Sequence, residues 1–230
     1  IHRFSQNPVD AMPEYEARRH NMVESQIRTN KVTDPGLIAV FSELPRELFL
    51  PEAQRSIAYI DEDIEIAPGR FLMEPMVLAR LIQSADISKN DMVLDIGCAF
   101  GYATAILARL ANTVVGLESD KRMIDKANSI LGELVVDNVA LMNGPLDKGF
   151  SKQAPYDVIL IGGAVESIPA AITKQLAEGG RLVTVISDGT GTGGSGTLVL
   201  RQGKDFSSRA LFDASTPILP GFQRAEEFIF

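Results

Sequence analysis

The stretch Val93-Leu94-Asp95-Ile96-Gly97-Cys98-Ala99-Phe100-Gly101 decides the fold, and Glu118 follows at the end of the next apolar run. It predicts an apolar strand that ends at Asp95, a glycine turn, and a helix that starts near Tyr102. Because glycine has no Cβ, Gly97 and Gly101 let the backbone approach a ligand closely. Glu118 lies 21 residues beyond Gly97, a distance that suits a second strand whose carboxylate binds a ribose diol. The stretch therefore predicts a site for an adenosine-containing cofactor.

The glycine spacing distinguishes between candidate cofactors. A dinucleotide site, Gly-x-Gly-x-x-Gly, would need glycine where Ala99 and Tyr102 stand, and a P-loop would need a lysine that the segment lacks. The pattern Asp-x-Gly-x-x-x-Gly with a later acidic residue is typical of class I methyltransferases that use S-adenosylmethionine (AdoMet). AdoMet has no phosphates, and its cationic sulfonium favours an acidic neighbour such as Asp95. The structural alternative is an ordinary strand-turn-helix whose glycines serve geometry alone.

The composition limits the class of protein. With 230 residues, 45% of them hydrophobic, the chain can form one sizeable α/β domain with a small appendage. A net charge of −8 argues against a nucleic-acid surface, and no apolar run is long enough to span a membrane. The single cysteine, Cys98, excludes an internal disulfide and favours a cytoplasmic location. We expect Cys98 to be a small residue of the turn rather than a reactive thiol. Because the only histidines are His2 and His20, we expect neither a metal site nor a histidine-based triad.

Apolar runs alternate with helical patterns from residue 91 onward. Strands are predicted at 92–96, 113–117, 135–142, 158–161 and 181–186, with helices at 102–110, 121–131 and 169–176. This alternation predicts a Rossmann-like, three-layer αβα sandwich with a mostly parallel central sheet. Antiparallel strands at 197–201 and 208–213, and a tail at 228–230, are expected to close the sheet. Residues 1–13 are expected to be an extension, 14–90 a cap of helices and short strands, and 91–230 the AdoMet-binding part of one integrated domain.

Several segments resemble the protein-L-isoaspartate O-methyltransferase family. The likeness covers about residues 22–186 and includes Leu44-Pro45-Arg46-Glu47-x-Phe49, Gly101-Tyr102-x-Thr104-Ala105 and Ala154-Pro155-Tyr156-Asp157. The first and last of these are not general methyltransferase features, so they indicate this family in particular. The resemblance implies that N-terminal helices cap a class I methyltransferase sheet, with AdoMet as methyl donor and S-adenosylhomocysteine as product. The implied partner is a protein or peptide that contains isoaspartyl residues.

The pattern and the resemblance together give the expected site. The cofactor is expected to lie against the glycine turn and the ends of the following two strands, at Asp95, Gly97, Cys98, Ala99, Gly101, Tyr102, Glu118, Ser119, Gly144, Pro145 and Leu146. The resemblance implies an acceptor lip formed by Arg70, Phe71, Met73, Glu74 and Pro75.

The departures from the family pattern fall at this site. The family carries Thr-Ile-Ser-Gln-Pro, whose hydroxyls line the acceptor pocket, where this chain has Phe71-Leu72-Met73-Glu74-Pro75. Phe71 and Met73 cannot donate hydrogen bonds to a carboxylate, and Glu74 would repel one. The family's Gly-Asp-Gly beside the adenine reads Gly144-Pro145-Leu146 here.

These departures leave three hypotheses open: an isoaspartyl methyltransferase, an AdoMet methyltransferase with another acceptor, and a non-catalytic AdoMet-binding or interaction protein. As a structural alternative, Phe71 and Met73 serve only as core residues of a β segment.

Overall fold

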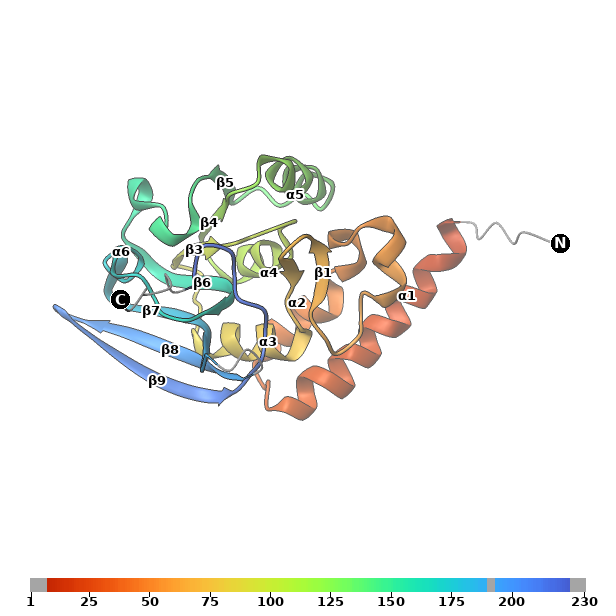
Figure 1. Cartoon of the computed structure of the whole chain (residues 1–230). Helices are drawn as coiled ribbons and strands as arrows, with labels where there is room; N and C mark the ends of the chain where they lie inside the picture. The colour runs from red at the N-terminus through yellow and green to blue at the C-terminus, as the bar shows by residue number, and fades with distance from the viewer. Residues whose placement is uncertain (1–7, 190–192, 224–230) are drawn as a thin grey trace, which may run out of the picture.

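A seven-stranded sheet forms the centre of the computed structural model, which describes residues 8–189 and 193–223, with side chains from residue 14 onward (Figure 1). The strands lie in the order β5-β4-β3-β6-β7-β8-β9. The neighbouring strands β5, β4, β3, β6 and β7 run parallel to one another, whereas β8 pairs antiparallel with β7 and β9 antiparallel with β8. Their bounds are β3 (Met92–Ile96), β4 (Thr113–Glu118), β5 (Val139–Asn143), β6 (Tyr156–Val165), β7 (Leu176–Ser187), β8 (Gly194–Gln202) and β9 (Asp205–Asp213). The predicted fold class is confirmed.

Both faces of the sheet are buried at its central parallel strands, as their near-continuous apolar sequences require, whereas the edge strand β9 is mostly exposed. Neighbouring residues of β3 enter different cores, since Val93 packs on one face and Leu94 on the other. The first face is covered by α2 (Pro35–Glu43), α3 (Pro75–Ser84), α4 (Tyr102–Leu110) and α5 (Lys121–Glu133). The second is covered by the short α6 (Ala170–Thr173), the turn at Leu146–Lys148 and the segment that contains Leu219 and Phe222.

The N-terminal part packs beside this sheet (Figure 1). Helix α1 (Pro8–Met22) continues through a π-helical turn, Val23–Ile27, and a 3₁₀ turn, Arg28–Asn30. Helix α2 begins at Pro35, because the Asp34 side chain caps it by accepting a hydrogen bond from the Leu37 N–H at 2.6 Å. Helix α1 begins at Pro8, inside the segment expected to be an extension, while residues 1–7 and the predicted tail 228–230 lie outside the described residues.

A separate two-stranded hairpin, β1 (Ile64–Ala67) and β2 (Arg70–Leu72), belongs to the N-terminal part and leads directly into α3. This connection carries residues 70–75 to the ends of the parallel strands. Short 3₁₀ turns at Arg46–Phe49 and Glu52–Ile57 precede the hairpin.

Several predicted boundaries differ from the structure. Strands β6 and β7 begin at Tyr156 and Leu176, before the predicted positions 158 and 181. The strand predicted at 135–142 starts only at Val139, because α5 runs to Glu133 and Val135 then lies exposed with a left-handed φ of +55°. The helix predicted at 169–176 is only Ala170–Thr173, since Leu176 already pairs with Tyr156 in the sheet. Among the described residues, no helix combines the length and apolar character needed to cross a membrane.

Candidate active site

The glycine turn between β3 and α4 is held by the backbone of the next strand. Gly97 and Cys98 both donate their N–H groups to the carbonyl of Leu117, at 2.8 and 3.2 Å. Gly97 has φ +81° and Gly101 has φ +92°, conformations that glycine adopts without steric cost. A Cβ on Gly97 would also lie 2.9 Å from the Leu219 side chain. The turn therefore requires glycine at these two positions.

Ala99 adopts the left-handed conformation without being glycine, at φ +51°. Its N–H donates to Glu118 Oε2 at 3.0 Å. A left-handed alanine costs about 1 kcal/mol or somewhat more, so this hydrogen bond helps to hold a strained turn. Cys98 is buried in the same turn, and burial raises the pKa of its thiol well above the ordinary value. The thiol stays protonated, as expected of a turn residue.

Asp95 provides an unused acceptor at this turn. Its side chain is fully buried, and Oδ2 accepts a hydrogen bond from the Thr104 hydroxyl at 2.6 Å. The other oxygen, Oδ1, has no hydrogen-bond partner among the described residues. Burial, reinforced by the charge of Glu118, raises the pKa of Asp95 to about 7. A buried oxygen of this kind suits a cationic or N–H-donating ligand.

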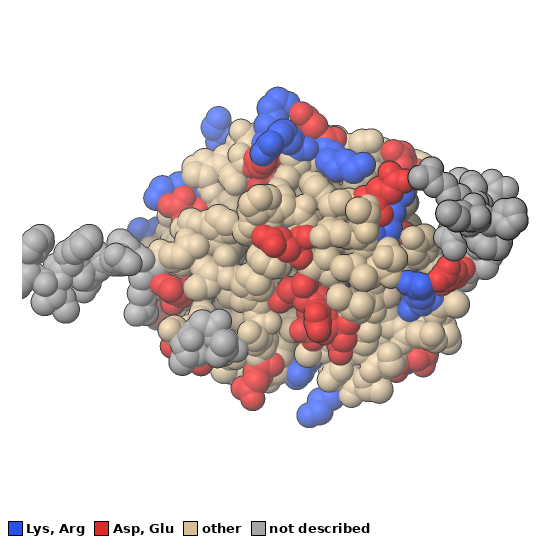
Figure 2. Space-filling model, turned by 45° about the vertical axis from the view of Figure 1, so that its right-hand side comes forward, with Lys and Arg blue, Asp and Glu red and all other residues tan. Residues whose placement is uncertain are grey.

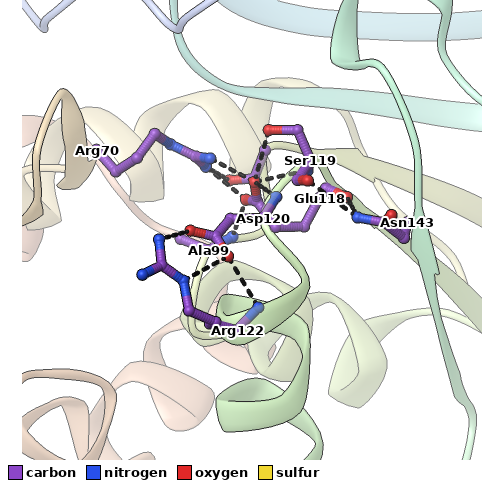
Figure 3. Close-up of polar contacts among 8 residues, drawn as sticks. Arg70, Ala99, Glu118, Ser119, Asp120, Arg122 and Asn143 are labelled. Carbon is purple, nitrogen blue, oxygen red and sulfur yellow. Dashed lines mark hydrogen bonds and ion pairs between the residues drawn. The ribbon is translucent and has the colours of Figure 1, made fainter.

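Glu118, the predicted ribose ligand, ends β4 and has no exposed surface. Its carboxylate accepts two hydrogen bonds from the Arg70 guanidinium, at 2.5 and 2.6 Å, and others from the N–H groups of Ala99, Ser119 and Asp120 (Figure 3). Burial alone would raise the pKa of Glu118, but the Arg70 pair and the N–H donors outweigh burial and lower it. The carboxylate is therefore ionised, and both of its oxygens already accept hydrogen bonds from protein donors.

Residues at the end of β5 fix the Glu118 loop from the other side. Asn143 donates its side-chain amide to the carbonyls of Glu118 and Ser119, both at 3.0 Å, and Gly144 donates its N–H to the carbonyl of Glu118 at 3.1 Å. Of the residues that follow, Pro145 is exposed and Leu146 is buried. The structure thus places Gly144 beside Glu118, together with Asn143, which the sequence did not indicate.

The acceptor lip and the glycine turn border one cavity. Phe71 is half-buried and Met73 is 5% exposed, and both line this cavity together with Asp95, Gly97 and Tyr102. The sequence interpretation placed the lip and the turn in one site, and the structure brings them together. Met73 is also part of the hydrophobic core, so a core role and a pocket role coincide at this residue.

Glu74 makes the lip acidic. Its N–H donates to Asp63 Oδ1 at 2.8 Å, and the residue, with its side chain half-buried, directly precedes α3. Burial, together with the charges of Asp61 and Asp63, raises the pKa of Glu74 to about 7. This carboxyl group is therefore about half ionised at neutral pH.

Arg46 anchors the lip from behind, a role that the sequence interpretation missed. The side chain is completely buried, and it donates to the carbonyl of Ala58 at 2.7 Å and to that of Met73 at 2.9 Å. Its guanidinium lies 4.9 Å from the centre of the Tyr102 ring. Arg46 belongs to the Pro-Arg-Glu segment that carried the family resemblance, which was the one signal that could have marked it.

Comparison with known proteins gives one consistent family. Residues 17–197 match the model of the protein-L-isoaspartate(D-aspartate) O-methyltransferase family. Protein-L-isoaspartate O-methyltransferase 1 of Rhodopseudomonas palustris is 36% identical over 174 residues, which are 76% of this chain and 71% of that protein. Protein-L-isoaspartate O-methyltransferase 2 of Anaeromyxobacter is 37% identical over 171 residues, 74% of this chain and 70% of that protein.

Solved structures agree on the fold. A protein-L-isoaspartate O-methyltransferase superimposes with a TM-score of 0.75 at 23% identity, covering 88% of this chain and 66% of that one. A Plasmodium falciparum protein described as a beta-aspartate methyltransferase, solved with S-adenosyl-L-homocysteine, superimposes with a TM-score of 0.69 at 20% identity, covering 89% and 97%.

Proposed function

The chain belongs to the protein-L-isoaspartate(D-aspartate) O-methyltransferase family, and from this premise we propose that it methylates a carboxylate of damaged aspartyl residues in proteins, using AdoMet. The observation that carries the proposal is the shared cavity, because it joins the glycine turn to the acceptor lip. The single cysteine supports a cytoplasmic site of action, where thiols stay reduced.

The residues of the cofactor side fit AdoMet in type and position. Gly97 and Gly101 give the turn its left-handed backbone, and the unpaired Asp95 Oδ1 suits a cationic group. Glu118 stands at the end of the neighbouring parallel strand, where a carboxylate that binds the ribose hydroxyls is expected. When bound, AdoMet supplies an electrophilic methyl group. The fit has one exception, since Arg70 already occupies the Glu118 carboxylate.

The acceptor side has to orient a carboxylate and exclude water. A carboxylate acceptor with a pKa of about 4 is ionised at pH 7 and needs no general base. Orientation in a dry site can contribute about 7–11 kcal/mol. Phe71 and Met73 exclude water from the lip, but they donate no hydrogen bonds, and each missing donor costs about 1–3 kcal/mol in such a site. We therefore expect slow isoaspartyl methylation.

A second candidate function keeps AdoMet but changes the acceptor. Glu74 lies beside Asp61 and Asp63, which disfavours an anionic group at the lip. Acidic side chains also gather in the middle of the molecular face drawn in Figure 2. A neutral or basic acceptor would meet no such repulsion. A non-catalytic AdoMet-binding role is the third candidate, supported by Pro145 in place of the family's adenine-side aspartate.

Transfer of labelled methyl from AdoMet to an isoaspartyl peptide tests the proposal, with the matching aspartyl peptide as control. Selective labelling of the isoaspartyl peptide supports it. If neither peptide is labelled although calorimetry shows AdoMet binding, the isoaspartyl assignment is overturned in favour of another acceptor. The variant Phe71→Thr/Met73→Ser then distinguishes lost family chemistry, which would return, from a changed acceptor, for which activity stays absent.

A further inference from the structure

Arg70 connects the two parts of the site that a cofactor is expected to contact. Its two terminal nitrogens bond to the two oxygens of Glu118, and Nη2 also donates to the carbonyl of Gly97 at 3.2 Å. The exposed fractions of the two side chains are 7% for Arg70 and 0% for Glu118. Arg70 therefore spans from the ribose carboxylate to the glycine turn, out of contact with bulk water.

The Glu118 carboxylate has no capacity left for a ribose. A carboxylate offers about four lone-pair sites. Oε1 accepts from Arg70 Nη1, from the N–H and hydroxyl of Ser119 and from the N–H of Asp120, while Oε2 accepts from Arg70 Nη2 and the N–H of Ala99. These six donors already exceed four sites (Figure 3). The hydroxyls of a ribose therefore have to compete with members of this set for the carboxylate oxygens.

The space beside the glycine turn leads to the same conclusion. The cavity bordered by Asp95, Gly97 and Met73 has a volume of about 30 Å³, which is room for about two water molecules. Leu219, only 4% exposed, lies against Gly97. It is held there because its N–H donates to the carbonyl of Ala164 at 2.9 Å. The small cavity and the Leu219 side chain leave little room for a ligand of the size of AdoMet directly beside Gly97.

Arg70, which bonds to Glu118 and to the Gly97 carbonyl, is the member of this set of Glu118 donors best placed to move. It belongs to the β1–β2 hairpin, which is a separate sheet and shares no ladder with the seven-stranded one. The residues at the tip of this hairpin, Pro68 and Gly69, are exposed. Withdrawal of the Arg70 side chain therefore breaks no hydrogen bond of the central sheet, whereas Ala99, Ser119 and Asp120 bond to Glu118 through their own main chain.

We infer that Arg70 is an internal ligand of the ribose carboxylate, which AdoMet must displace, so that Arg70 sets the cofactor affinity of this chain. The inference rests on the proposed function, because it takes AdoMet to be the ligand. A bidentate guanidinium–carboxylate pair is stronger than a hydrogen bond from a neutral hydroxyl. The fraction of molecules with a free Glu118 is therefore small, and the apparent dissociation constant rises in inverse proportion to that fraction.

Calorimetric titration with S-adenosylhomocysteine tests this inference on the full chain. Arg70→Gln is expected to bind at least about tenfold more tightly than the wild type. Arg109→Gln is the matched control, because it removes the same charge from an exposed ion pair with Glu43. This control is expected to bind like the wild type.

Equal or weaker binding by Arg70→Gln, alongside measurable binding by the wild type, would overturn the inference and leave the proposed function intact. If neither protein binds, the proposed function fails as well. Arg70→Lys provides a second variant, since a lysine retains the charge but cannot form the bidentate pair. Its affinity is expected to lie between those of the wild type and Arg70→Gln, and the increase in melting temperature with S-adenosylhomocysteine should follow the same order.

Discussion

The two walls of the cavity are held in place differently. The glycine turn is fixed by main-chain hydrogen bonds from Gly97 and Cys98 to Leu117, and by left-handed backbone at three positions. The lip is fixed by long-range contacts that include two buried arginines, since Arg70 reaches Glu118 and Arg46 reaches the carbonyl of Met73. The turn can therefore tolerate few changes, whereas the lip keeps its position while the side chains between its anchors change. This explains how a family fold persists with Phe71 and Met73 in place of hydroxyl residues.

The largest effect is expected where the two walls meet. Glu118→Ala leaves the Arg70 guanidinium buried without its carboxylate, so we expect a loss of about 3–5 kcal/mol in the free energy of unfolding. Urea denaturation measures this loss. Glu133→Ala, at the exposed end of α5, is the control and should change stability by less than about 0.5 kcal/mol. Similar small effects for both variants would show that the pair does not hold the walls together.

A smaller loss is expected from the anchor behind the lip. In Arg46→Lys, one ammonium group replaces two separated donors, so the carbonyl of Ala58 or that of Met73 loses its partner. We expect the free energy of unfolding to fall by about 2–3 kcal/mol, measured by urea denaturation. The exposed Arg28→Lys substitution serves as the control. An unchanged midpoint for Arg46→Lys would mean that the lip keeps its place without this anchor.

These anchors mark the limit of what the sequence predicts. The parallel sheet, the turn at Gly97 and the start of α2 follow from apolar periodicity, glycine spacing and the Asp34-Pro35 pair, all of which act over a few residues. Arg70 and Glu118 are 48 residues apart, and no local pattern tells a guanidinium at a hairpin end which carboxylate it will meet. Arg70 was expected at the acceptor lip, and its contact with the cofactor side became visible only in the fold.

The predicted strand boundaries are wrong for a related reason. Apolar character alone places Val135 in a strand, but the residue is 84% exposed at the end of α5. Periodicity records which residues are apolar, whereas tertiary packing decides which of them are covered. The same limit applies to Met73, whose side chain serves the core and the cavity together.

The acidity of the lip gives a pH-dependent prediction. Because the pKa of Glu74 is raised to about 7, this side chain is mostly neutral at pH 6 and mostly charged at pH 8, while an isoaspartyl carboxylate is ionised at both. Repulsion therefore grows as the pH rises, and methyl transfer by the wild type should fall about three- to tenfold from pH 6 to pH 8. Glu74→Gln should remove most of this fall.

The exposed Glu133→Gln variant, which removes a charge that does not act on Glu74, should keep the pH dependence of the wild type. Initial rates with a labelled isoaspartyl peptide measure all three proteins. Identical pH profiles for the wild type and Glu74→Gln would exclude Glu74 as the group responsible.

The smallest effect is expected in the turn. The left-handed φ of +51° strains Ala99. Glycine would relieve this strain, although it also raises the conformational entropy of the unfolded chain. Ala99→Gly should therefore stabilise the protein by about 0.5–1 kcal/mol in thermal or urea unfolding. Ala103→Gly, in the first turn of α4, is the opposite control and should destabilise the protein, because glycine is a poorer helix former than alanine. A destabilised Ala99→Gly variant would mean that the turn is not strained at this residue.

In this site one carboxylate, Glu118, is proposed to bind Arg70 in the free protein and the cofactor ribose in the complex. A crystal structure with S-adenosylhomocysteine tests it most directly. The predicted result is a ribose whose hydroxyls bond to Glu118, with the Arg70 guanidinium withdrawn from that carboxylate and Ala99, Ser119 and Asp120 still bonded to it. A structure in which S-adenosylhomocysteine binds while both Arg70–Glu118 hydrogen bonds remain would contradict the claim.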